Sequence, residues 1–176
     1  WDADAGSEVS SCTVSRNVVS FAKWIGQEGD LVVQASEDLT IRVWDVRTMS
    51  KPAMAIVKAH NNVMTCCDAS ADGNLLLTSS NGFDGAGCEL RVWDRRKQGS
   101  MLADLVGHVQ SVTCCAFLPV TLSASSSYQL VISGSQDGTI RTWDVQSAGS
   151  LDCATVDTQH RLTSLAVCTP PPGQPA

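Results

Sequence analysis

The sequence predicts an all-β fold made of repeated four-stranded units. The dipeptide Trp-Asp occurs four times, beginning at residues 1, 44, 93 and 143, so the intervals are 43, 49 and 50 residues. Each of the last three copies ends a run of six residues in which polar and apolar side chains largely alternate. These runs are rich in β-branched residues, as short strands are. Three further strand-like runs recur around each of these copies, which gives four predicted strands per unit.

The predicted strands follow the same order in all three units. They cover 18–24, 31–36, 40–45 and 53–57, then 63–69, 75–80, 89–94 and 101–106, and finally 112–118, 130–135, 139–144 and 151–156. One more strand is expected before the first unit, near 11–15, and another after the third, at 162–168. The proline-rich tail 169–176 cannot donate ladder hydrogen bonds at its prolines and is expected to be extended.

Four-stranded units of about 40 to 45 residues that close on Trp-Asp resemble the WD-repeat family of β-propellers. The resemblance implies an open arc of about three blades. The implied divisions are the end of a preceding repeat at 1–17, blade one at 18–57, blade two at 58–106, blade three at 107–156 and the first strand of a further blade at 157–168. Because propellers usually close with four to eight blades, the remaining blades of the same chain are expected, and this arc alone is expected to be marginally stable or prone to aggregation.

The third unit carries the side chains that form a buried hydrogen-bond network in that family. They are His108, Ser133, Asp137 and Trp143. Such a network suits the physics, because a buried indole N–H, imidazole and carboxylate each need a partner.

The other two units depart from this pattern. The second keeps His60, Thr78 and Trp93, but its turn is enlarged into the glycine-rich insertion 81–88. The first keeps Asp38 and Trp44. It has Asn17 where His is expected and Gln34 where Ser or Thr is expected, so an incomplete network is predicted there.

Catalytic chemistry is not expected. All three histidines, at positions 60, 108 and 160, begin a unit, so none remains for catalysis. Ser133, His108 and Asp137 could be mistaken for a hydrolase triad, but no nucleophile elbow surrounds the serine. The glycines at 82, 85 and 87 resemble a phosphate loop, yet a strand follows them instead of a helix. No catalytic residue and no cofactor are therefore predicted.

Composition excludes further classes. A net charge of −6 and a sequence pI of about 4.8 argue against a nucleic-acid module, and no apolar run is long enough for a membrane span. The eight cysteines contain no Cys-x-x-Cys pair, so neither a metal site nor a disulfide framework is predicted. They are interpreted as reduced core thiols, which together with the absence of a visible signal peptide predicts a cytoplasmic location.

Other proteins are the expected partners. Phe83 lies at the tip of the insertion, and loops of this kind often contact partners. Residues 80–89 also resemble a cilium-associated member of the WD-repeat family, which implies a non-enzymatic scaffold or adaptor in a ciliary or cytoskeletal setting.

A basic patch supports an alternative. Arg47, Arg95 and Arg96 follow a Trp-Asp. The segments 44–47 and 93–96 fit the Trp-Asp-x-Arg ending found in substrate receptors of cullin-4 ubiquitin ligases, in which arginine recognition would be charge-assisted. The alternative function is therefore that of such a substrate receptor.

Overall fold

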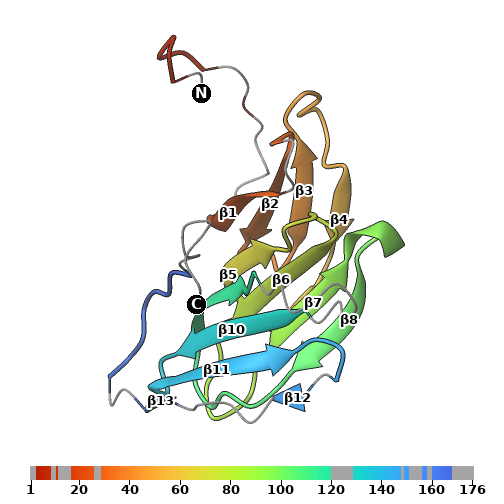
Figure 1. Ribbon diagram of the computed structural model, residues 1–176. Coiled ribbons are helices and arrows are strands. Elements are labelled where there is room, and N and C mark those ends of the chain that lie inside the picture. Colours follow the sequence, from red (N-terminus) through yellow and green to blue (C-terminus); the bar gives the residue numbers. More distant parts are fainter. Residues whose placement is uncertain are drawn as a thin grey trace, which may run out of the picture.

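The computed structural model confirms the all-β fold class. It describes residues 3–8, 11, 17–25, 29–119, 129–147, 149–150, 156–157 and 160–167. Over these residues the secondary structure consists of strands and one short 3-10 helix, η1 (Arg95–Lys97). The strands form three antiparallel sheets that follow one another along the chain (Figure 1).

Each sheet takes its strands from one predicted unit. Sheet one contains β1 (Val19–Ile25), β2 (Leu31–Ser36), β3 (Ile41–Asp45) and β4 (Met54–Ile56); sheet two contains β5 (Met64–Ala69), β6 (Leu75–Ser80), β7 (Leu90–Asp94) and β8 (Ser100–Leu105); sheet three contains β9 (Val112–Phe117), β10 (Leu130–Ser135), β11 (Thr139–Asp144), β12 (Gly149–Ser150) and β13 (Val156–Asp157). The first eleven predicted strands of the three units therefore lie within one residue of the observed β1 to β11 at each end.

The ends of the chain depart from the predictions or lie outside the described residues. Over 161–167 no strand forms, so the strand predicted at 162–168 is absent from its described part. This segment nevertheless lies beside β9, where the Thr113 hydroxyl donates to the Leu162 carbonyl at 2.6 Å. Residues 151–155 of the outer strand predicted at 151–156 lie outside the described residues. On either side of them, β12 and β13 pair with opposite ends of β11. The strand predicted near 11–15, apart from residue 11, and the tail 169–176 lie outside the described residues.

Two apolar cores lie between the three sheets. Val33, Ile41 and Val43 of sheet one pack with Met64 and other side chains of sheet two in the first core. The second core joins the opposite face of sheet two to sheet three, with residues that include Leu77, Leu90, Val92, Val112 and Val131. Because both faces of sheet two are covered, its central strand β6 is buried throughout. Burial of this apolar area holds the sheets face to face.

The inner strands β1, β5 and β9 share an irregularity that joins neighbouring sheets. Register shifts occur at Ser20, Thr65 and Thr113, at the equivalent place in each strand. The bulged Thr65 hydroxyl donates to the Val112 carbonyl of β9, just as Thr113 donates to Leu162. The inner strands are therefore tied together by polar contacts as well as by the cores.

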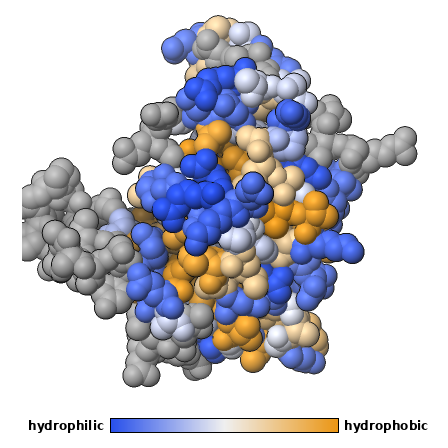
Figure 2. Space-filling view, turned by 90° about the vertical axis from the view of Figure 1, so that its right-hand side faces the viewer, coloured by the Kyte–Doolittle hydropathy of each residue, from blue (hydrophilic) through white to orange (hydrophobic). Residues whose placement is uncertain are grey.

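The outer strands β4 and β8 lie on the right of Figure 1, the side that Figure 2 turns toward the viewer. This face mixes apolar and hydrophilic patches (Figure 2). On β8, Met101 and Leu102 are 53% and 50% exposed.

Candidate functional site

Sheet three holds the complete polar network that the sequence predicts. The Trp143 indole N–H donates to Ser133 Oγ at 2.8 Å, and His108 Nε2 lies 2.8 Å from the same oxygen. His108 Nδ1 lies 2.9 Å from an oxygen of Asp137. Because a carboxylate only accepts, Nδ1 carries the proton and the serine hydroxyl donates to Nε2. The indole, hydroxyl, imidazole and carboxylate thus form one directed chain of hydrogen bonds.

Asp137 is the acid of this network and has three further hydrogen bonds besides the one from His108. It accepts from the backbone amides of Val109 at 3.1 Å and Thr139 at 2.9 Å, and from the Thr139 hydroxyl at 2.6 Å. Burial raises the pKa of Asp137, but the hydrogen bonds from Thr139, His108 and Val109 outweigh it and hold the pKa at about 2. Burial lowers the pKa of His108, so its imidazole is neutral in the folded protein.

Sheet two builds the same network with a different acid. Thr78 Oγ1 accepts from the Trp93 indole at 2.9 Å and lies 2.8 Å from His60 Nε2. The insertion removes the turn aspartate, and Glu89 faces His60 instead, at 3.5 Å from Nδ1. Neither His60 Nδ1 nor Glu89 Oε1 has a hydrogen-bond partner among the described residues. Sequence reasoning missed Glu89. When the second and third units are aligned on Trp93 and Trp143, Glu89 occupies the position of Thr139 and not that of the turn aspartate.

Sheet one contains an incomplete network, in which no histidine in the part of the chain that the structure describes links the indole acceptor to the aspartate. The Trp44 indole donates to Gln34 Oε1 at 2.6 Å, and the Gln34 amide donates to Ser36 Oγ at 2.7 Å. Asp38 accepts from Asn17 at 3.3 Å and from Arg42 at 2.5 Å. The longer glutamine replaces serine as the indole acceptor, while the aspartate pairs with an arginine instead of a histidine.

The hydrolase-like geometry in sheet three is inaccessible. Ser133 is 0% exposed and His108 is 2% exposed, and the serine oxygen already accepts from Trp143. A nucleophile without access to substrate has no catalytic use, so the network is structural. Over the described residues, no group of three or more His, Cys, Asp or Glu side chains could hold a metal ion, and no helix is both long and apolar enough to span a membrane.

The insertion is fastened to sheet three. Phe83 forms β-bridges with Ala86 and with Gln110, and the Gly85 amide donates to the Val109 carbonyl at 3.0 Å. The Ser111 hydroxyl donates to the Gly82 carbonyl at 3.0 Å. Gly82 has no room for a side chain, because a Cβ there would lie 2.3 Å from the Ala86 carbonyl oxygen. The insertion is therefore a small hairpin held against the start of β9.

This hairpin lies at what we call the network end of the sheets, where β1, β5 and β9 begin and where the network histidines lie. Exposed apolar side chains occur repeatedly in the loops of this end. They are Val57, Val63, Phe83, Val106 and Val109, exposed by 70, 38, 69, 66 and 53%. Scattered exposed apolar residues are ordinary, but a recurrence at one end favours contact with another protein.

The three candidate arginines lie at the opposite end. Phe83 precedes β7, whereas Arg95 and Arg96 follow it, so the structure does not bring the two sets together. Arg47 contacts Asp45 at 2.7 Å and Asp30 at 3.2 Å, and Arg96 contacts Asp94 at 3.1 Å. Arg95 donates to the Gly73 carbonyl at 2.7 Å.

These pairs make the predicted basic patch less positive than the sequence suggests. The Arg47 guanidinium beside Asp45 lowers the pKa of that carboxyl to about 2, and Arg96 lowers the pKa of Asp94 in the same way. The arginine side chains at 47 and 96 are still 64% and 62% exposed, so a partner could contact them together with their aspartates.

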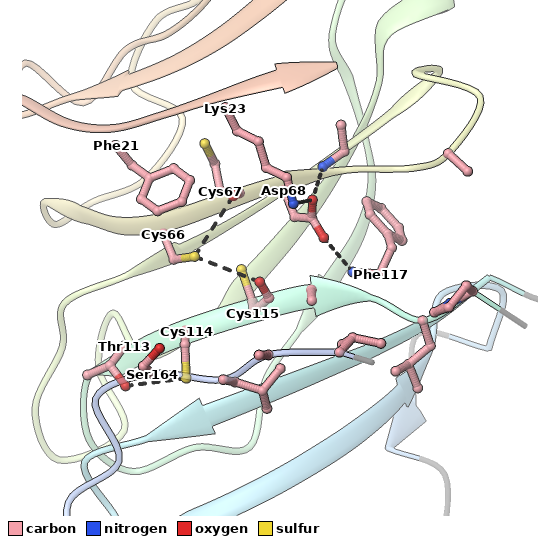
Figure 3. A pocket seen from close by; sticks show the side chains of 18 of the residues that line it. Phe21, Lys23, Cys66, Cys67, Asp68, Thr113, Cys114, Cys115, Phe117 and Ser164 are labelled. Atoms are coloured by element: carbon pink, nitrogen blue, oxygen red, sulfur yellow. Dashed lines mark hydrogen bonds and ion pairs between the residues drawn. The ribbon is translucent and has the colours of Figure 1, made fainter. Parts of the chain in front are cut away.

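A cavity of about 900 Å³ lies along the inner strands (Figure 3). Asp68 is central to it: one carboxylate oxygen lies 2.5 Å from Lys23 Nζ of β1, and the other accepts from the Phe117 amide of β9 at 2.8 Å. Asp68 is only 4% exposed. One buried carboxylate thus joins the inner strands of all three sheets, and sequence reasoning missed it because its partners lie 45 and 49 residues away.

Several curated proteins are similar to this chain. It is 28% identical to nuclear distribution protein nudF of Aspergillus niger over 82% of the chain, and 29% identical to the U3 small nucleolar RNA-associated protein 15 homolog of Gallus gallus over 84%. It is also 28% identical to the ribosome biogenesis protein WDR12 homolog of Oryza sativa over 83%. The chain spans 34, 25 and 30% of the length of these three relatives.

A family model gives the more specific result. The model described as "WD domain, G-beta repeat" matches residues 52–94 and 99–144, which together make up half of the chain. Each match begins at the outer strand of one sheet and ends at the Trp-Asp of the next, so every sequence repeat spans two sheets. The repeats, the three antiparallel sheets and the buried Trp, His and hydroxyl side chains agree with these matches, and the chain belongs to the WD40-repeat family.

Proposed function

We propose that this chain is a non-enzymatic scaffold that binds another protein through the network end, with Phe83 as its central anchor. The observation that carries the proposal is the hairpin around Phe83. Its backbone is fixed to Val109 and Gln110 of sheet three, yet the phenyl ring is 69% exposed. An aromatic side chain on a preorganised backbone loses little conformational entropy on binding and is a typical anchor of protein interfaces.

The apolar neighbours support the same surface. Val106 and Val109 lie in the loop that the hairpin contacts. Apolar groups grouped around an aromatic anchor exclude water from an interface, which strengthens the contacts at its centre.

Affinity purification of the tagged chain with quantitative mass spectrometry tests the proposal. The variant Phe83→Ser is compared with Met101→Ser, a matched control in which an apolar side chain 53% exposed on β8 is replaced. We expect Phe83→Ser alone to lose a subset of the co-purified proteins by tenfold or more, with an unchanged unfolding midpoint. Identical partner sets in the two variants would contradict the proposed surface.

The cellular setting forms a second part of this proposal. We infer a cytoplasmic, cilium-associated or cytoskeletal setting, because residues 80–89 resemble the corresponding turn of WD-repeat-containing protein 31. The relatives described above are named for nuclear distribution, small nucleolar RNA and ribosome biogenesis. Imaging of the tagged protein against ciliary and nucleolar markers distinguishes these settings, and a nucleolar signal alone would overturn ours.

Nucleic acid is not among the proposed partners. The net charge of −6 opposes the phosphate backbone. The exposed arginines at 47 and 96 are also beside carboxylates. Titration of labelled RNA with the protein at 50 mM salt is expected to show no salt-sensitive binding.

A substrate receptor of a cullin-4 ubiquitin ligase is the alternative function. It is favoured by the equivalent, exposed positions of Arg47 and Arg96 after the Trp-Asp of β3 and β7. The double variant Arg47→Ala, Arg96→Ala should then lose co-purification of the ligase adaptor while retaining the partners that depend on Phe83. Unchanged adaptor recovery would exclude this alternative.

A further inference from the structure

Four of the cysteines lie where the inner strands of sheets two and three meet. Cys66 and Cys67 are consecutive on β5, and Cys114 and Cys115 are consecutive on β9. Consecutive residues of a strand point to opposite faces. Cys66 and Cys115 therefore belong to the core between sheets two and three, whereas Cys67 belongs to the core between sheets one and two. All four carry free thiols.

The geometry brings Cys66 and Cys115 together. The Cys66 thiol donates to the Cys115 carbonyl oxygen at 3.8 Å. Figure 3 shows their side chains pointing toward one another between β5 and β9. Two residues further along both strands, Asp68 accepts from the Phe117 amide at 2.8 Å. This bond holds the strands at a fixed spacing beside the thiols.

The cavity gives a small oxidant a route to this pair. Its volume is about 900 Å³, and Cys66, Cys115 and Lys23 are among the residues that line it. Cys66 and Cys115 are 8% and 7% exposed. Hydrogen peroxide is close to water in size, so it fits such a cavity easily.

The electrostatic environment distinguishes the two thiols. The contact with the Cys115 side chain lowers the pKa of Cys66, and burial opposes this effect without overcoming it. The same contact with Cys66, together with burial, raises the pKa of Cys115. Cys66 is therefore the thiol that ionises first, and Cys115 is the resolving thiol beside it, an arrangement that suits redox-sensitive cysteine pairs.

We propose that Cys66 and Cys115 are a peroxide-responsive modification site that closes to a disulfide between β5 and β9. The Cys66 thiolate attacks one oxygen of hydrogen peroxide and becomes a sulfenic acid, and the departing hydroxide takes a proton to leave as water. Cys115 sulfur then attacks the Cys66 sulfur, an S–S bond forms, and the sulfenic oxygen leaves as a second water with the Cys115 proton. Two thiols are oxidised, and one peroxide is reduced to two waters.

The disulfide would lock the inner strands of sheets two and three together. It connects residues 49 positions apart, so it restricts the unfolded chain over a long loop and stabilises the folded protein against it. Neither Phe83 nor the network histidines line this cavity, so the proposal is independent of the proposed function.

Peptide mapping of the peroxide-treated chain tests this site. Trypsin cuts after Lys58 and Arg91 to release one peptide with Cys66, and after Lys97 and Arg141 to release another with Cys115. We expect a dithiothreitol-sensitive crosslink between these peptides and the loss of two alkylatable thiols per chain. The first peptide also contains Cys67 and Cys88, and the second also contains Cys114, so the variants Cys67→Ser, Cys88→Ser and Cys114→Ser serve as matched controls.

Each outcome supports or overturns the proposal. Retention of the crosslink in Cys67→Ser, Cys88→Ser and Cys114→Ser, with its loss in Cys66→Ser and in Cys115→Ser, supports it. A crosslink that depends on Cys67, Cys88 or Cys114 overturns it. So does a sulfinic acid at Cys66 without a crosslink, or a chain without substitutions whose thiols peroxide does not oxidise. The unmodified sequence is mapped as well, so the result does not depend on the folding of any variant.

Discussion

Sheets two and three use the same indole, hydroxyl and imidazole but join them to different acids. In sheet three, Asp137 lies in a tight turn, 2.9 Å from His108 Nδ1. In sheet two the insertion occupies that turn, and Glu89 approaches His60 only to 3.5 Å. The comparison shows that the acid depends on turn geometry, while the rest of the network depends on the strand register that both sheets share.

The insertion provides another link in place of the lost aspartate. In sheet three, Asp137 accepts from the Val109 amide and so ties the turn to the loop before β9. The hairpin of sheet two reaches the same loop through Gly85 and Ser111. Sheet two therefore exchanges a charged contact within the sheet for backbone contacts to its neighbour.

The largest difference between the two networks is expected when the histidines are removed. His108→Ala removes two short hydrogen bonds, one of them to the Asp137 carboxylate, and should lower the free energy of unfolding by about 3 kcal/mol. His60→Ala removes one good hydrogen bond and one long contact, so about 1–2 kcal/mol is expected. Urea unfolding followed by tryptophan fluorescence measures both values. The exposed His160→Ala is the control, and equal losses at 60 and 108 would show that the acids contribute nothing to the difference.

A smaller effect is expected from Asp137→Asn. The carboxylate accepts four hydrogen bonds from His108, Val109 and Thr139. The amide keeps the size but loses the charge and turns one acceptor into a donor. We expect a loss of about 2 kcal/mol, in the range for hydrogen bonds to charged groups. A change in the urea midpoint no larger than that of a surface variant would contradict the role assigned to Asp137.

Acid should weaken the folded state through these same groups. Burial lowers the pKa of His60 and His108 below their ordinary value of 6.5. Between that value and the lower folded pKa, the unfolded chain binds more protons, so stability falls as the pH drops from 7 toward 5. Asp137 adds a second loss below its ordinary pKa of 3.8, toward its folded value of about 2. Urea midpoints measured at pH 7, 6 and 5 test the histidine contribution, and a flat profile would contradict it.

Strand positions could be predicted from sequence because the repeat is local and occurs three times. The same register places Trp143, Ser133 and His108 together, so the network of sheet three could also be predicted. The contacts between sheets could not. Lys23, Asp68 and Phe117 are far apart in sequence and follow no short pattern.

Positions that depart from the family pattern were the second reason why sequence reasoning did not fully predict the hydrogen-bond networks of sheets one and two. Gln34 departs from the family pattern, yet its longer side chain still reaches the Trp44 indole at 2.6 Å. Glu89 lies outside the turn in which the acid is normally found. A pattern compares residue types at fixed positions, whereas the physical requirement is an acceptor at the right point in space, and side chains of different length meet it from different positions.

The smallest effect is expected for Glu89→Gln, which separates the acid from the rest of the sheet-two network. The carboxylate lies 3.5 Å from His60 Nδ1 and 3.4 Å from Arg91, both longer than good charge-assisted hydrogen bonds. The His60 imidazole lowers the pKa of Glu89 against the opposing effect of burial, so the residue is charged at neutral pH. Glutamine keeps its length and an acceptor oxygen, and we expect a loss below about 1 kcal/mol, less than half that of Asp137→Asn in the same urea assay. A loss equal to that of Asp137→Asn would show that the long contact to His60 is as strong as the short one to His108, and the two sheets would then differ in geometry but not in energy.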